Sequence, residues 1–122
     1  VIYFGHGEPG AISGYRSIHR SELPVSGKRQ KRTIFLLSCS SLDSVNESSL
    51  GEQFIDNRLA TRVVGYRGKI SFTDNKSLLV KICMNLRLDD EITQAQISRL
   101  ARHCDIENLE KVNFPEAGKH SG

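Results

Sequence analysis

The chain has 122 residues, of which 38% are hydrophobic and 25% charged, with 17 basic and 14 acidic side chains. This length is typical of one domain, and a net charge of +3 is too small to indicate nucleic acid as a partner. No apolar run approaches the roughly 20 residues that cross a bilayer, and no segment resembles a secretory or transit signal. We therefore expect a cytoplasmic protein with no membrane partner.

The three cysteines, Cys39, Cys83 and Cys104, are widely and irregularly spaced. An odd number at such spacing is a poor disulfide framework, and a reducing compartment is the natural interpretation. Grouping Cys83, His103 and Cys104 with His6 as zinc ligands fits no standard spacing. We expect neither a metal ion nor another cofactor.

The first residue is Val1, and it already lies inside an apolar run. A sheet that begins so abruptly needs neighbouring strands. We expect a domain over residues 1–114 that lacks its N-terminal strands and follows an upstream regulatory or recognition region. Residues 115–122, PEAGKHSG, read as a polar tail.

The first third of the chain predicts a strand followed by loops. Residues 1–4 read as a buried strand, residues 5–14 as a glycine-rich loop, and residues 15–24 as irregular chain with one helical turn near Ser21. The basic stretch GKRQKR (residues 27–32) follows, and a solvated loop is its common role. It contains no aromatic side chain on which bases would stack.

The middle of the chain alternates strands and helices. Thr33–Leu37, TIFLL, is continuously apolar, as expected of an inner parallel strand. Ser49 and Glu52 have the spacing of a capping box and predict a helix. Its expected apolar face is Leu50, Phe54, Ile55 and Leu59. Residues 62–66, RVVGY, predict another strand, and residues 70–72 are a weaker candidate for a third.

Two helices are expected in the last part. Asp74 or Asn75 is the expected cap of the first, and Thr93 leads the second through His103, with a break at residues 89–90. Their expected inward faces are Leu78, Leu79, Ile82 and Leu86, and Ile97, Leu100 and Ala101. Together these patterns predict an α/β layered domain, with a mostly parallel sheet flanked by helices.

Chemistry-bearing residues follow two of the expected strands. The first strand runs into Gly5-His6-Gly7, and the second runs into Ser38-Cys39-Ser40. Ligands collect beyond the carboxyl ends of parallel strands. If the two strands are neighbours, His6 and Cys39 share one edge, as a thiol nucleophile and its base require.

The glycine after the histidine suits the same chemistry. Attack on a carbonyl creates an oxyanion, which needs preorganised N–H donors. The backbone amides of Gly7 and Cys39 are the expected donors. Each residue also has a plainer role, since a lone cysteine after a strand often packs in the core. Ser40 and Ser41 lack the Gly-x-Ser-x-Gly context of a serine nucleophile.

The blocks VIYFGHG and IFLLSCSS, in this order, resemble the caspase-like (clan CD) cysteine peptidases. The chain looks most like the CHAT and separase branch, because SSLGEQFIDNRLA, VVGY, SFTDN and TQAQISRLARHC follow in the family's order. The resemblance covers roughly residues 1–104. It implies a caspase-like layered fold and a cysteine endopeptidase that works through an acyl-enzyme.

The resemblance also implies residue roles. His6 would be the general base and acid, Cys39 the nucleophile, and the amides of Gly7 and Cys39 the oxyanion donors. Asp74 would bind a basic side chain at P1, the substrate residue before the cleaved bond. The partners would be a protein or peptide substrate and a regulatory partner or ligand that activates the enzyme.

Several alternatives remain open at this point. Asp74 fits a helix N-cap equally well, and an apolar P1 residue, as in self-processing toxin or effector peptidases, then becomes as plausible. The chain also fits a catalytically silent caspase-like scaffold that binds other proteins. An acyltransferase or thiol hydrolase would use the same two residues. The basic stretch Lys28–Arg32 is a candidate contact for an anionic activator, or a cleavage site.

Overall fold

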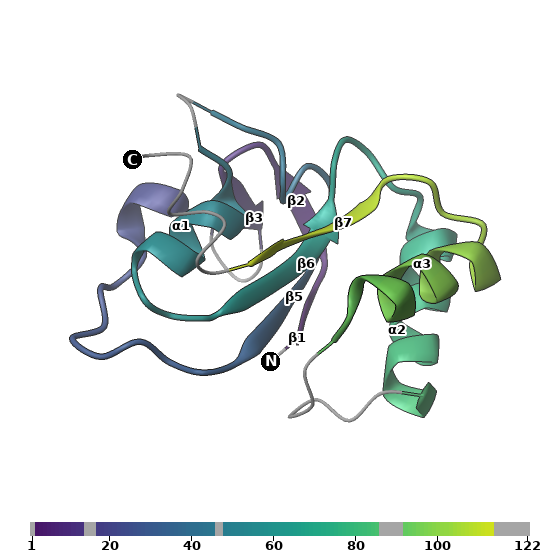
Figure 1. Ribbon diagram of the computed structural model, residues 1–122. Helices are drawn as coiled ribbons and strands as arrows, with labels where there is room; N and C mark the ends of the chain where they lie inside the picture. The colour runs from purple at the N-terminus through teal and green to yellow at the C-terminus, as the bar shows by residue number, and fades with distance from the viewer. Residues whose placement is uncertain (1, 14–16, 46–47, 86–91, 114–122) are drawn as a thin grey trace.

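The computed structural model describes residues 2–13, 17–45, 48–85 and 92–113. They form a mixed α/β arrangement of two sheets and three α-helices (Figure 1). The main sheet has the order β1-β5-β6-β7, in which β1, β5 and β6 are parallel and β7 is antiparallel to β6. Its strands are β1 (Ile2–Phe4), β5 (Thr33–Leu37), β6 (Arg62–Tyr66) and β7 (Leu109–Asn113). The prediction of a mostly parallel sheet flanked by helices is confirmed.

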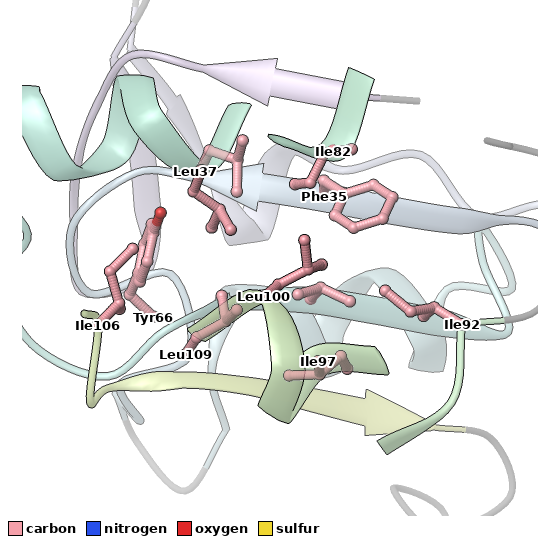
Figure 2. Close-up of a cluster of buried hydrophobic side chains, with 11 residues drawn as sticks. Phe35, Leu37, Tyr66, Ile82, Ile92, Ile97, Leu100, Ile106 and Leu109 are labelled. Carbon is pink, nitrogen blue, oxygen red and sulfur yellow. The ribbon is translucent and has the colours of Figure 1, made fainter. Parts of the chain in front are cut away.

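Helices α2 (Phe72–Asn85) and α3 (Gln94–His103) cover one face of the main sheet. Alternate residues of the strands, such as Phe35, Leu37 and Tyr66, point to this face. Figure 2 shows how they pack with apolar side chains of the helices and the following loop. The helices contribute Leu78, Ile82, Ile97 and Leu100, the segments on either side of α3 contribute Ile92 and Ile106, and β7 contributes Leu109.

The opposite face is covered by α1 (Leu50–Asp56) and by the small second sheet. Here the intervening strand residues Ile34, Leu36 and Val63 point inward. They pack against Leu50, Ile55, Leu42, Ala60 and Ile12. Both faces of β5 are therefore buried, which explains its continuous apolar sequence.

Residues 5–13 differ from the glycine-rich loop expected over residues 5–14, and residue 14 lies outside the described residues. Residues 5–13 contribute two strands of a three-stranded antiparallel sheet in the order β2-β3-β4. The strands are β2 (His6–Glu8), β3 (Ala11–Ser13) and β4 (Ser17–His19). Gly10, at φ +80°, makes the tight turn between β2 and β3. A 3-10 turn over Arg20–Glu22 follows, close to the helical turn expected near Ser21.

The capping predictions gave mixed results. Ser49 and Thr93 cap α1 and α3 as expected, each accepting a hydrogen bond from the backbone three residues on. The predicted start of α2 is wrong. That helix begins at Phe72, and the Ser71 hydroxyl accepts the Asp74 N–H at 3.1 Å. The strand considered for residues 70–72 is therefore replaced by the cap and first residue of this helix.

The antiparallel strand β7 was not among the strands expected from the sequence. Leu86, the expected break at residues 89–90 and the tail at 115–122 lie outside the described residues. Among the described residues, no helix is both long enough and apolar enough to cross a membrane.

Candidate active site

His6 and Cys39 follow the paired ends of β1 and β5. Phe4 pairs with Leu37 in the parallel ladder, and the Gly5 N–H donates to the Leu37 carbonyl oxygen at 3.3 Å. His6 follows Phe4 by two residues, and Cys39 follows Leu37 by two. Neighbouring strands lie about 4.8 Å apart. The two strands are therefore neighbours, the condition set by the sequence analysis, and both residues follow carboxyl ends at one edge of the sheet.

His6 and Cys39 line one pocket of about 170 Å³. The other lining residues are Phe4, Gly5, Ile70, Phe72 and Asn75. Cys39 is partly buried and His6 is exposed. No hydrogen bond joins the two side chains among the described residues. Both residues nevertheless line the same small pocket.

The Cys39 thiol contacts the backbone of Ile70. The thiol donates to the Ile70 carbonyl oxygen at 3.4 Å, and the Ile70 N–H donates to the sulfur at 3.3 Å. A thiolate would also accept the hydrogen bond from the Ile70 N–H, whereas the bond to the Ile70 carbonyl oxygen requires the protonated thiol. In this arrangement the thiol proton is directed toward the Ile70 carbonyl oxygen.

The turn after β5 is fixed by the turn after β6. The Ser40 N–H donates to the Gly68 carbonyl oxygen at 2.7 Å, and the Gly68 N–H donates to both carboxylate oxygens of Asp43 at 2.9 and 3.0 Å. The Leu42 N–H donates to the Tyr66 carbonyl oxygen at 2.9 Å. Ser40 itself has φ +59°, a conformation that is costly for a residue other than glycine. These bonds hold the sharp turn that presents Cys39.

Asn75, which lines the pocket, stabilises the end of β5. It is buried, and its Nδ2 donates to the Leu37 carbonyl oxygen at 2.6 Å. Its Oδ1 accepts from the Tyr66 hydroxyl at 2.8 Å. Burial, followed by the nearby Cys104, Asp74 and Cys39, raises the pKa of Tyr66, so its hydroxyl remains a donor. The first turn of α2 is thereby joined to the carboxyl ends of two strands.

Gly7 lies in β2, where it pairs with Ile12 and crosses the turn that carries Cys39. A Cβ at position 7 would lie 2.7 Å from both Cβ and Oγ of Ser38 and 2.9 Å from the Cys39 carbonyl oxygen. Only glycine fits at this distance. The missing side chain therefore has a packing role, and Gly7 is not among the residues that line the pocket. The oxyanion role of the Gly7 and Cys39 amides stays a prediction.

Asp74 occupies the third position of α2, with its N–H on the Ser71 hydroxyl. A carboxylate in the first helical turn is favoured by the helix dipole. The residue that lines the pocket is its neighbour Asn75, and Asp74 does not line it. The structure therefore does not bring Asp74 together with His6 and Cys39 in this pocket.

The sequence did not indicate Ile70, Phe72 and Asn75 as pocket residues; Asn75 was expected as a helix cap, and the other two as part of a strand. A signal for Asn75 was present, since it lies three residues before Leu78 and so shares the apolar face of the helix. A polar residue on such a face must find a buried partner. No comparable signal distinguishes Phe72, because its role depends on where α2 begins.

The basic stretch is partly structural. Arg29 donates to the carbonyl oxygens of Ile55 and Ala60 at 2.7 and 3.3 Å, at the end of α1. Arg58 donates to the Gly27 carbonyl oxygen at 3.1 Å. In the part of the chain that the structure describes, no group of three or more potential ligands could hold a metal ion.

In comparisons with known proteins, no protein-family model, no curated protein and no solved structure matches this chain. The site must be interpreted from its own geometry.

Proposed function

We propose that the chain carries a cysteine endopeptidase site of the caspase-like type, with His6 and Cys39 as its catalytic pair. The observation that carries the proposal is the shared register. The two residues follow paired strand ends by the same two positions and line one pocket. The parallel order of β1, β5 and β6 is compatible with the caspase-like fold that the sequence resembles.

The reaction would proceed in two steps. The Cys39 thiol gives its proton to His6, and the sulfur attacks the peptide carbonyl carbon to form a tetrahedral oxyanion. The C–N bond then breaks, the leaving amine takes the proton from His6, and a thioester remains. Water gives a proton to His6 and attacks the thioester. The C–S bond breaks, and Cys39 regains the proton as a thiol.

The contact between Cys39 and Ile70 bears on how such an enzyme is switched on. The thiol proton that His6 must accept is directed toward the Ile70 carbonyl oxygen. The thiol has to turn toward His6 before the first proton transfer. Rotation about the Cβ–Sγ bond would redirect the thiol proton, and a substrate or regulatory partner that breaks the contact with Ile70 would favour this rotation.

The test is cleavage of a defined peptide library, read by mass spectrometry, with the wild type and single variants. Cys39→Ala and His6→Ala are each expected to lower the cleavage rate by about a thousandfold or more. Cys83→Ala is the matched control, because Cys83 is a free, exposed cysteine outside the pocket. Cleavage that survives in Cys39→Ala would contradict the proposal. A wild type that cleaves no peptide but binds a partner protein would favour the silent scaffold.

A further inference from the structure

We infer that the pocket beside Cys39 binds one apolar side chain of the substrate, between leucine and phenylalanine in size, and excludes a basic one. This inference rests on the proposed peptidase function and gives its P1 preference. Three apolar residues from separate segments form the pocket wall: Phe4 at the end of β1, Ile70 after β6, and Phe72 at the start of α2. Among the described lining residues none is acidic.

The volume of the pocket fits a single side chain. At about 170 Å³, it is smaller than the roughly 300–1,000 Å³ of pockets that hold small-molecule ligands. It is close to the engineered apolar cavity of about 150 Å³ that takes up benzene. A leucine, methionine or phenylalanine side chain is of this size.

Phe72 forms an exposed apolar rim at this pocket. Its ring is packed against the ring of Phe4, with 5.8 Å between centroids and a tilt of 56°. Even so, 68% of Phe72 is exposed. An apolar side chain of a bound peptide would remove part of this surface from water, which favours binding.

A basic side chain would find no partner in the same place. An arginine in a pocket is stabilised by a carboxylate that pairs with it, and the only candidate from the sequence was Asp74. Asp74 lies in the first turn of α2 outside the pocket lining. A guanidinium that entered would lose water contacts without a charged replacement.

The direct test uses peptide acyloxymethyl ketone probes that differ only at P1, on the full chain. We expect the leucine probe to label Cys39 about tenfold faster or more than the arginine probe. Faster labelling by the arginine probe would overturn the inference and leave the peptidase function intact. Equal rates of labelling by the glycine and leucine probes would also overturn the inference and leave the peptidase function intact. If leucine, arginine, aspartate and glycine probes all fail to label Cys39, the proposed function fails as well.

A single substitution should reverse the preference. Phe72→Asp places a carboxylate on the pocket rim, at the first position of a helix, where acidic residues are favoured. The leucine probe should then label at least about tenfold more slowly and the arginine probe faster than in the wild type. Thr73→Asp is the matched control, because it adds the same charge at an exposed neighbouring position outside the pocket lining. An equal change of preference in Thr73→Asp would overturn the role of the pocket.

Phe72→Ala separates loss of the apolar wall from a general loss of activity. It should slow the leucine probe more than it slows the arginine and glycine probes, so that the preference for leucine becomes smaller. Met84→Ala removes another exposed apolar side chain from the same helix and should change none of the three. Equal slowing of all three probes by Phe72→Ala would contradict the inference.

Discussion

The two sides of the candidate site are held in different ways. On the Cys39 side, backbone and side-chain hydrogen bonds join the turn after β5 to the turn after β6, and Asn75 supports it from α2. On the His6 side, the Tyr3 hydroxyl donates to the His6 carbonyl oxygen at 2.9 Å, and the imidazole itself is exposed. Cys39 thus lies on a turn that several hydrogen bonds fix, whereas His6 is positioned through its backbone.

This difference has a consequence for mutagenesis. Substitutions around Cys39 should lower the free energy of unfolding, because they leave buried polar groups unpaired. Substitution of the His6 side chain should remove activity with little effect on stability. We expect the loss in free energy of unfolding to decrease in the order Asn75→Ala, Gly7→Ala, Ser41→Ala and His6→Ala.

Asn75→Ala should have the largest effect. It removes the donor to the Leu37 carbonyl oxygen and the acceptor of the Tyr66 hydroxyl, both in the buried interior. We expect a loss of about 2–4 kcal/mol, measured by urea unfolding. Lys76→Ala, at the next and exposed position, should change stability by less than about 0.5 kcal/mol. A similar midpoint for both variants would mean that Asn75 does not support the turn.

Gly7→Ala should come next. The added methyl group meets Ser38 and the Cys39 carbonyl oxygen at less than 3 Å, so the backbone must shift. We expect a loss of about 1–3 kcal/mol in thermal or urea unfolding. Gly27→Ala is the matched control, because nothing lies within 4 Å of a Cβ at that position. Equal stability of Gly7→Ala and Gly27→Ala would contradict the close contact of Gly7 with Ser38 and the Cys39 carbonyl oxygen.

Two serines of the Cys39 turn should respond differently to alanine. Ser41 Oγ donates to the Leu36 carbonyl oxygen at 2.9 Å and accepts the Tyr66 N–H at 3.0 Å. Ser38 Oγ is equally buried, but it has no hydrogen-bond partner among the described residues. Ser41→Ala should cost about 1–2 kcal/mol, and Ser38→Ala should be close to neutral. Equal losses in parallel urea titrations would contradict this distinction.

His6→Ala should have the smallest effect on stability. The side chain is exposed, so we expect a change below about 0.5 kcal/mol in the free energy of unfolding. The same preparation should have lost its peptidase activity. A large destabilisation would show that His6 is a structural residue and would remove the contrast between the two sides.

Much of the main sheet could be predicted from local sequence. The run TIFLL and the run RVVGY are apolar enough to be inner strands, and Ser49 and Thr93 mark the starts of their helices. The small sheet could not be predicted, because each of its strands has three residues and the segment is rich in glycine. Three residues are too few to show an alternating pattern.

The candidate site was predictable only in part. His-Gly and Cys-Ser each follow an apolar strand, and this order indicated His6 and Cys39 as a pair. The parallel pairing of β1 with β5 places both residues after neighbouring strand ends. The pocket wall depends on tertiary structure, since Ile70 and Phe72 reach it only because Ser71 starts α2. The Ser71 hydroxyl caps α2, whereas Asp74 and Asn75 were the expected caps.

The most direct test of the central claim compares Cys39 with Cys83 in one molecule. Cys83 is exposed and Cys39 is partly buried, so reaction governed by exposure alone would modify Cys83 first. We expect a leucine acyloxymethyl ketone to modify Cys39 in preference to Cys83, as located by peptide mass spectrometry, and we expect His6→Ala to abolish this preference. Preferential modification of Cys83, or Cys39 labelling that is unchanged in His6→Ala, would contradict the central claim.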